Sequence, residues 1–271
     1  MFDNLKLLKS YFNDKVELLR YRHILPSNMR HDDLYIVEFP KSGITWLSTI
    51  IANTCFLEEG MNKEATHYNL EQIIGDIHVT EFIGVNSSVY PYHRIIKSHT
   101  EYNPYYRHVI YIIRNPFSVM NSYYNYLVSN KLFKGNFESF VRDSDFGISK
   151  WKKHVESWVI PKRNLKLHLI RYEDLIDTPD ETIANLYRNL GWKINDSIKK
   201  EALELSCFEH MKELDNLYKY NCPFRGYDFV REGKKTPEID SASRKYIYEN
   251  SVSFLEKFYP DILVKNYEEN S

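Results

Sequence analysis

The sequence has few cysteines, and those present form no pattern that cysteine chemistry requires. Its 271 residues include three, Cys55, Cys207 and Cys222, which lie far apart without a C-x-x-C pair. Neither a disulfide framework nor a cysteine-ligated zinc site is therefore indicated. This usage is typical of a protein in a reducing compartment, and we expect a cytoplasmic location.

Long apolar runs and a surplus of one charge are also lacking. No segment approaches the ~18 apolar residues of a membrane-spanning helix, and the N-terminus lacks the pattern of a secretory signal. We therefore expect neither a membrane span nor export. The 36 lysines and arginines are balanced by 37 aspartates and glutamates. A general nucleic-acid binder carries surplus positive charge, so no nucleic-acid partner is expected.

What the chain does have is enough apolar sequence for a full core, because 43% of its 271 residues are hydrophobic. One α/β domain of this length is ordinary. No repeat, linker or low-complexity tail divides the sequence. We therefore expect a single domain over residues 1–271.

The stretch over residues 34–53 predicts a strand, a tight loop and a helix. Residues 34–39, apart from Glu38, are β-branched, aliphatic and aromatic, as in a buried strand, and Pro40 ends the run. Apolar residues then recur at helical spacing on one face, namely Trp46, Leu47, Ile50, Ile51 and Cys55. The loop therefore opens a helix.

The loop itself has the composition of an anion-binding site. A helix start presents unpaired backbone N–H groups and the positive end of its dipole. The sequence adds a cation, two hydroxyls and a permissive glycine, which are Lys41, Ser42, Thr45 and Gly43. It is not a Walker A loop, because Lys41 precedes the loop's glycine instead of following a second one. An ordinary β-to-α turn with a solvated lysine is the alternative for the tripeptide Lys41-Ser42-Gly43 alone.

Two later strands are predicted to end in polar side chains at the same edge of the sheet. Residues 92–96 are followed by Lys97-Ser98-His99, and residues 108–113, the most apolar strand signal in the chain, are followed by Arg114. In open α/β sheets ligands sit beyond the carboxyl ends of the strands, so these side chains are expected beside the loop. If the first strand is considered alone, His99 could instead be an ordinary surface residue. If the second is considered alone, Arg114 could instead pair with a surface carboxylate.

Arg114 precedes a predicted helix with a recognisable start. Asn115 is suited to the N-cap and Pro116 to the first helical position. Ser122 follows about two turns later, at ~3.6 residues per turn, where it can face the same groove. Because arginine binds phosphate bidentately, Arg114 with Ser122 predicts a phosphate clamp.

The remaining segments are predicted to be mostly scaffold. They comprise helices over residues 4–25, 179–189 and 239–258, a strand over 165–170, short helices and loops over 60–90, and a helix from Ser206. Asp177 or Thr178 caps the second of these helices, and Gly191 ends it. Acceptor specificity is expected in the loops over residues 60–90.

Five segments in chain order resemble one family. They are residues 39–46, 97–99, 114–124, 147–158 and 171–175. The first three resemble the 5′-phosphosulfate loop, the catalytic-histidine segment and the 3′-phosphate motif of the cytosolic-type sulfotransferases, which use 3′-phosphoadenylyl sulfate (PAPS). The fourth, with Gly147, Trp151, His154, Val155 and Trp158, resembles their structural G-x-x-x-W-x-x-H-V stretch, and the fifth their Tyr-Glu-Asp-hydrophobic signature. The resemblance covers about residues 34–235.

This resemblance implies a fold and a chemistry. The fold is the three-layer α/β/α, P-loop kinase-like sulfotransferase fold around a central parallel sheet. PAPS is the implied co-substrate and 3′-phosphoadenosine 5′-phosphate (PAP) the product, without a metal. By the same resemblance, Lys41 stabilises the leaving phosphate, Lys97 contacts the sulfuryl oxygens and His99 takes the proton of the acceptor hydroxyl.

The nucleotide-binding residues that the resemblance implies fall into three groups. Those at the 5′ end are Lys41, Ser42, Gly43, Ile44, Thr45 and Trp46. Those that border the adenine are Trp46, Tyr172, Ser206 and Phe208. Those at the 3′-phosphate are Arg114, Ser122, Arg231, Glu232 and Gly233.

The chain departs from the family pattern in three places. Ile44 stands where a second threonine is usual, and Ser118 where an aspartate is common. Glu232 replaces a lysine in the loop over the 3′-phosphate, and no Gly-Asp-Trp follows it. Glu232 changes the charge of the loop over the 3′-phosphate, and the missing Gly-Asp-Trp affects how that loop closes.

The sequence leaves the acceptor and two alternative functions open. A phenol, an aliphatic alcohol, an amine or a sugar hydroxyl suits the same donor machinery, so the expected partner is a small-molecule or carbohydrate acceptor. The oligomeric state is open too, because the family's short dimerisation motif has no intact copy here. A phosphotransferase using ATP and magnesium and a nucleotide-binding module without turnover are the alternatives from other classes.

Overall fold

The structure is a computed structural model that describes residues 29–66, 69–70, 73–77, 94–162, 164–221 and 239–260. Its centre is a parallel sheet of five strands in the order β2-β3-β1-β4-β5. The strands are β1 (Leu34–Glu38), β2 (Gly75–Asp76), β3 (Ile95–Ser98), β4 (His108–Ile113) and β5 (Lys166–Arg171). β1 lies between β3 and β4 and is buried along its whole length. Burial on both faces explains why residues 34–37 are an unbroken apolar run.

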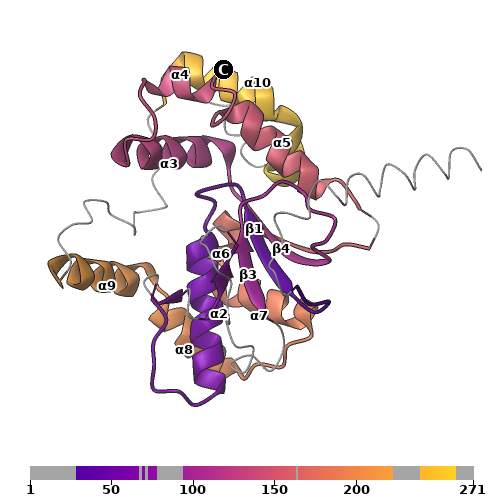
Figure 1. Cartoon of the computed structure of the whole chain (residues 1–271), viewed down its shortest axis with the longest axis vertical. Coiled ribbons are helices and arrows are strands. Elements are labelled where there is room, and N and C mark those ends of the chain that lie inside the picture. The colour runs from indigo at the N-terminus through magenta and orange to yellow at the C-terminus, as the bar shows by residue number, and fades with distance from the viewer. Residues whose placement is uncertain are drawn as a thin grey trace, which may run out of the picture.

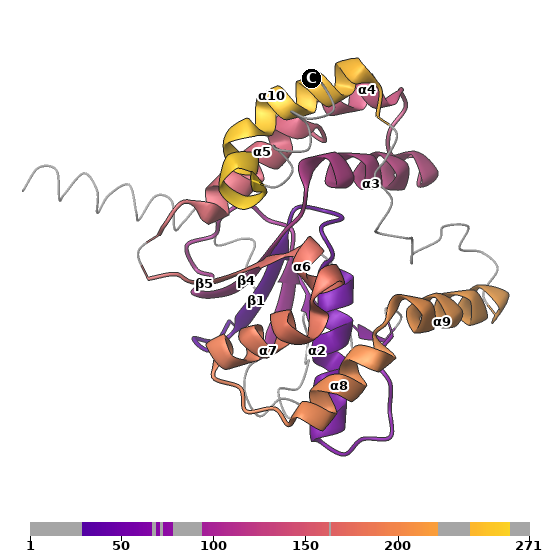
Figure 2. The same cartoon turned by 180° about the vertical axis from the view of Figure 1, so that it is seen from behind.

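One face of the sheet is covered by α2 (Ile44–Glu58), α6 (Tyr172–Asp177) and α7 (Pro179–Leu190), as Figure 1 shows. α8 (Asp196–Leu205) packs against α2 and extends this layer. α9 (Phe208–Asn221) follows α8 and lies at the edge of the molecule in both views (Figures 1 and 2). Alternate residues of β1 and β4 face this layer and form a largely aliphatic core, including Leu34, Ile36, Ile110 and Ile112.

The other face is covered by α3 (Pro116–Ser129), α4 (Phe137–Val141), α5 (Ile148–Val159) and α10 (Ser241–Phe258) (Figure 2). The core on this side is aromatic, and its largest fully buried side chains include Tyr35, Tyr106, Tyr111, Trp151 and Trp158. A parallel sheet between two helical layers is the three-layer α/β/α architecture that was predicted, and the prediction is confirmed.

Most predicted elements are confirmed, with small shifts at their ends. β4 has the predicted bounds, and β5 begins and ends one residue late. Asn115 caps α3 by accepting the N–H of Phe117, and Pro116 is its first residue. α7 ends before Gly191, whose φ of 76° lies in the left-handed region that favours glycine. The helix expected over residues 4–25 lies outside the described residues.

Three predictions were wrong in detail. β3 includes Lys97 and Ser98, because both pair in register with β1, whereas the sequence suggested that the strand ends before them. Gly75 and Asp76 form the edge strand β2, where only short helices and loops were expected over residues 60–90. The helix expected from Ser206 begins at Phe208, because Ser206 is the C-cap residue of α8.

Candidate active site at the carboxyl edge of the sheet

The loop after β1 adopts a backbone that its glycine makes possible. Lys41 has a φ of 75° and Gly43 a φ of 115°, both in the left-handed region. Gly43 stands at the N-cap of α2, and a Cβ added there would overlap the ring of Tyr172. Position 43 therefore requires glycine for its conformation and for the close approach of that ring.

The start of α2 presents backbone donors at the end of this loop. Within the part of the chain that the structure describes, the N–H groups of Gly43, Thr45 and Trp46 have no hydrogen-bond partner. Ser42 is committed to the loop itself, because its Oγ donates to Phe39 O at 2.8 Å. Three available N–H groups at the positive end of a helix dipole can hold an anion.

Glu38 lies buried beneath the loop and accepts two of its N–H groups. Lys41 N donates to Oε1 at 3.1 Å, and Ile44 N donates to Oε2 at 2.6 Å. Burial raises the pKa of this carboxyl to about 7, against the opposing effects of the Ile44 N–H and of the nearby Lys41 and Arg114 charges. Glu38 is not among the site residues predicted from the sequence. A lone acidic residue at the end of an apolar strand was the available signal.

Arg114 and Lys41 connect the loop to neighbouring elements. Arg114 Nη1 donates to Lys41 O at 2.9 Å, and the guanidinium lies 4.1 Å from the ring centroid of Tyr172. Lys41 Nζ lies 5.0 Å from the ring centroid of Tyr126 on α3. Ser122 lies half-buried on the same helix. The end of β4 and the loop are thus held together, as the sequence predicted for Lys41 and Arg114.

His99 follows β3 and stands next to the loop. Its side chain is 32% exposed, and Nδ1 lies 3.4 Å from Glu38 O and 4.0 Å from Glu38 Oε1. The predicted meeting of this histidine with the β1 loop at one sheet edge is therefore observed. One side of the imidazole faces protein acceptors, and part of the ring is open to solvent.

A series of buried polar contacts holds the backbone at His99. The carbonyl oxygen of His99 lies 3.2 Å from His154 Nε2, and Tyr111 Oη lies 2.9 Å from His154 Nδ1. Burial lowers the pKa of His154 to about 3, so its ring is neutral, donating from Nε2 and accepting the Tyr111 hydroxyl at Nδ1. The next carbonyl, of Thr100, accepts from Trp158 Nε1 at 2.9 Å.

Lys97 does not project freely past the strand end. It is mostly buried within β3, opposite Asp76 of β2, and its Nζ lies 3.5 Å from Asp76 Oδ2. This partner could not be predicted from the sequence, because a strand of two residues carries no detectable pattern.

A second group of predicted residues meets at the start of α2. The rings of Trp46 and Tyr172 are in edge contact, with centroids 5.9 Å apart, and Trp46 Nε1 donates to Ser206 O at 2.8 Å. Ser206 Oγ accepts from Asn53 at 3.0 Å. Phe208 begins α9 shortly after Ser206. The predicted site residues Arg231, Glu232 and Gly233 lie outside the described residues.

Glu173 is another carboxylate that the sequence analysis did not place at the site. Its Oε1 accepts the N–H of Asn115 at 3.0 Å, and its Oε2 accepts the hydroxyl of Tyr259 at 2.7 Å. It therefore joins the start of α3 to α6 and to the residue that follows α10.

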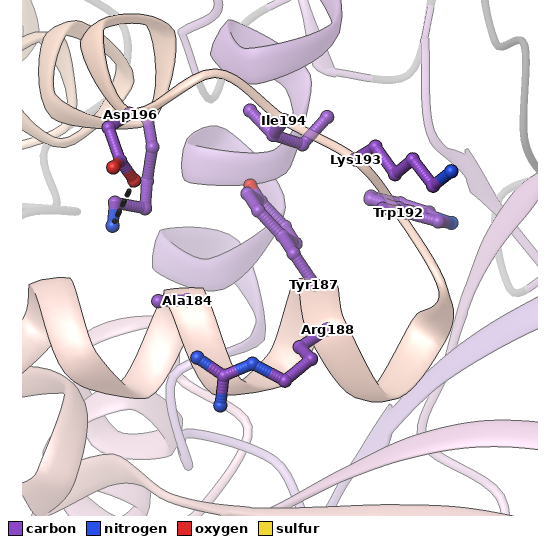
Figure 3. A pocket seen from close by; sticks show the side chains of 8 residues that line it. Ala184, Tyr187, Arg188, Trp192, Lys193, Ile194 and Asp196 are labelled. Carbon is purple, nitrogen blue, oxygen red and sulfur yellow. Dashed lines mark hydrogen bonds and ion pairs between the residues drawn. The ribbon is translucent and has the colours of Figure 1, made fainter.

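A separate surface pocket lies between α7 and α8, as Figure 3 shows. Its volume is about 240 Å³, and its lining residues are Ala184, Tyr187, Arg188, Trp192, Lys193, Ile194, Asp196 and Lys199. None of the predicted site residues lines it. The ammonium of Lys199 is engaged by Asp180 and Asp196.

The described residues contain no group of three or more histidine, cysteine, aspartate or glutamate side chains arranged to hold a metal ion. Among the helices in the described ranges, none has the length and apolar character to cross a membrane.

Comparison with known proteins matches residues 31–260 to the family model for the sulfotransferase domain. Sulfotransferase 1E1 of Bos taurus is 27% identical over 215 residues, which cover 71% of this chain and 70% of the bovine protein. Among solved structures, mouse sulfotransferase SULT7A1 complexed with PAP superposes with a TM-score of 0.62 at 22% identity and 93% coverage of both chains. Retinol dehydratase in complex with androsterone and PAP gives a TM-score of 0.61 at 17% identity, covering 83% of this chain and 82% of its own. These two likenesses establish the fold.

Proposed function

This chain belongs to the sulfotransferase domain family, and we propose that it transfers a sulfuryl group from PAPS to a hydroxyl or amine of a small-molecule or carbohydrate acceptor. The observation that carries the proposal is the shared position of Lys41, the start of α2 and His99 at one sheet edge. In-line transfer of a sulfuryl group needs charge stabilisation for the leaving group and a base for the attacking group. A cytoplasmic location, suggested by the cysteine usage, is part of the same proposal.

The loop fits the 5′-phosphosulfate end of PAPS. The N–H groups of Gly43, Thr45 and Trp46 are available among the described residues and lie at the positive end of the α2 dipole. PAPS supplies the activated sulfuryl group when it is bound. Lys41 offsets the negative charge that grows on the phosphate as it leaves, and Lys97, held beside Asp76, contacts the sulfuryl oxygens.

His99 takes the proton of the acceptor. As the acceptor oxygen forms its bond to sulfur, the bond between sulfur and the phosphate oxygen breaks, and the acceptor proton moves to the imidazole. Histidine suits this task because imidazole changes charge between ~pH 5 and 8. The partial exposure of the His99 ring gives an acceptor access to it.

The other nucleotide contacts follow from the two groups of side chains around α2 and β4. Trp46, Tyr172 and Phe208 border the adenine, with Ser206 behind Trp46. Arg114 and Ser122 bind the 3′-phosphate together with Arg231, Glu232 and Gly233. Arg114 Nε is buried without a partner among the described residues, which leaves a donor for an anion.

Recognition of the 3′-phosphate provides the test, because ATP-using enzymes have no need for it. PAP is expected to raise the melting temperature far more than ADP at equal concentration, since a ligand at ~100 times its Kd adds roughly 2.7 kcal/mol. Arg114→Met should abolish the preference, because a charge-assisted contact worth about 1.5 to 3 kcal/mol is lost. Arg107→Met, at an exposed arginine outside the site, is the matched control. Equal shifts with ADP and PAP on the unaltered protein would contradict the proposal and favour a phosphotransferase.

The acceptor class is found by turnover. Incubating the protein with labelled PAPS and a library of phenols, aliphatic alcohols, amines and sugars should give label transfer to one class, without added magnesium. Binding of PAP without transfer to any class would favour the nucleotide-binding module.

A further inference from the structure

Glu38 is a buried acid that the chemistry described so far does not use. It ends β1, pairs with Ile112 of β4, and has a side chain that is only 3% exposed. Removing a carboxylate from water is costly unless hydrogen bonds and charges compensate. Its environment therefore shows what the residue does in the fold.

The two carboxylate oxygens of Glu38 face two different parts of the site. Oε2 accepts the N–H of Ile44, the first residue of α2. Oε1 accepts the N–H of Lys41 and lies 4.0 Å from His99 Nδ1. The backbone carbonyl of Glu38 is closer still to Nδ1, at 3.4 Å. Glu38 thus contacts both the loop after β1 and His99, the proposed base.

This arrangement favours one tautomer of His99. Acceptor oxygens on the Nδ1 side favour a proton on Nδ1, which leaves the lone pair on Nε2. The backbone of His99 is held separately by His154, so the ring is constrained at two points.

We propose that Glu38 is a positioning residue for sulfuryl transfer, which holds the loop through Lys41 and Ile44 and keeps the proton of His99 on Nδ1. This inference rests on the proposed function. His99 Nε2 accepts the proton of the acceptor hydroxyl as the new S–O bond forms and the bond from sulfur to the leaving phosphate breaks. The imidazolium that results faces the Glu38 carboxylate, which stabilises it, and the proton then leaves to solvent from the exposed side of the ring.

The charge of Glu38 changes near neutral pH. The charged groups that face it are Lys41, Arg114 and His99, and the phenols of Tyr111 and Tyr172 lie nearby. Burial raises the pKa of Glu38 to about 7, so the carboxylate loses its charge as the pH falls through that value. The acid limb of the pH–rate profile therefore belongs to the pair of Glu38 and His99 rather than to either group.

The first test compares Glu38→Gln with the unaltered protein across pH 5 to 9 at saturating PAPS and acceptor. Glutamine keeps the shape of the side chain and one acceptor oxygen for the loop, but it has no charge to stabilise the imidazolium. We expect kcat to fall about 10- to 100-fold and the acid limb to move to lower pH. Glu101→Gln, which alters an acid already engaged by Lys150 and Lys153, should leave the acid limb in place. An acid limb that Glu38→Gln does not move would overturn the inference.

A double-mutant cycle separates positioning of His99 from general support of the fold. If Glu38 acts through His99, adding Glu38→Gln to His99→Ala should change kcat less than about twofold. A further loss in the double variant as large as that in the single variant would mean that Glu38 acts through the loop or the fold and not through His99, and would overturn the inference.

A third readout needs no turnover. Long-range proton–nitrogen correlation spectra of the free protein, with the His99 signals assigned by their loss in His99→Ala, should show the Nδ1–H tautomer. Glu38→Gln should reduce its population, and an Nε2–H tautomer in the unaltered protein would overturn the inference. Failure of the proposed function can be told apart from failure of the Glu38 inference. If the unaltered protein neither prefers PAP nor transfers the sulfuryl group, the proposed function is wrong before any variant is made.

Discussion

The two faces of the sheet differ in composition and in what they hold. The face covered by α2, α6 and α7 is built mainly from isoleucine, leucine and alanine, and it supports the loop through the helix that the loop opens. The face covered by α3, α5 and α10 is built mainly from aromatic side chains. On that side His154 and Trp158 contact the backbone carbonyls of His99 and Thr100, and the hydroxyl of Tyr111 contacts His154.

This difference shows why the aromatic residues matter for the site. Aliphatic side chains fill space and position α2, but they offer no hydrogen bonds. Buried tyrosine, tryptophan and histidine side chains fill space and also satisfy carbonyls that a loop leaves unpaired. The loop after β1 is therefore held by the start of α2 and by the carboxylate of Glu38. The backbone at the proposed base, His99, is held by the polar atoms of His154 and Trp158. Variants on the two sides should therefore affect different parts of the transfer, namely the charge on the leaving phosphate and the removal of the acceptor proton.

The largest effect is expected at His99, whose backbone is held by side chains of the aromatic face. His99→Ala should lower kcat by on the order of 10²- to 10⁴-fold, the usual range for loss of a general base, while the PAP-induced shift in melting temperature stays near normal. Turnover of PAPS with the identified acceptor and thermal shift with PAP measure the two quantities. His31→Ala, at an exposed histidine, is the control. Near-normal turnover of the His99 variant would remove this residue from the mechanism.

The matching change on the loop side is Lys41→Met. We expect kcat to fall by about 10²- to 10³-fold, because the charge that stabilises the leaving phosphate is lost. Unlike the histidine variant, this one should also lose part of its PAP-induced stabilisation. Unfolding of the variant, as judged by circular dichroism and melting, or turnover at the unaltered rate, would show that the loop assignment is wrong.

The sequence predicted the local units of the site better than the contacts between them. The β1 loop with α2 and the β4 end with α3 were predicted because strand pattern, cap and helix period all lie within about two dozen neighbouring residues. Glu38 was missed because its contact with His99 spans 61 residues of chain. The pairing of Lys97 with Asp76 was missed because it depends on a strand of two residues. Such long-range partners leave no periodic signal in a single sequence.

A smaller effect compares two neighbouring residues of β4 that face opposite sides. Tyr111→Phe leaves His154 Nδ1 buried without a donor and should destabilise the fold by about 1 to 3 kcal/mol. Ile112→Val removes one methyl group from the aliphatic core and should cost about 0.5 to 1.5 kcal/mol. Urea unfolding measures both changes.

Only the tyrosine variant is expected to lower kcat, by about tenfold, because His154 then holds the His99 carbonyl less firmly. Equal kcat values for the Tyr111 and Ile112 variants would mean that the aromatic face supports the fold without positioning the base.

The last effect concerns two buried groups whose influence on stability changes with pH in opposite directions. The pKa of His154 is about 3 in the folded protein, below its ordinary value of 6.5, so the unfolded chain binds more protons between these values and stability falls as the pH drops through that window. The pKa of Glu38 is about 7 when folded and 4.5 ordinarily, so the folded protein binds more protons there and stability falls as the pH rises through that window. The two slopes partly cancel between pH 4.5 and 6.5.

Glu38→Gln removes one slope and leaves the other. Relative to the unaltered protein, the variant should gain stability as the pH rises from 5 to 8, on the order of 1 to 3 kcal/mol in total, since one pKa unit corresponds to ~1.4 kcal/mol. His154→Gln should show the converse, with its deficit shrinking as the pH falls from 6.5 toward 5. Urea unfolding at four pH values measures both differences. A Glu38→Gln difference that is constant with pH would mean that the carboxylate beneath the loop ionises as it does in water, and that its burial is compensated by the loop N–H groups and by the charges around it.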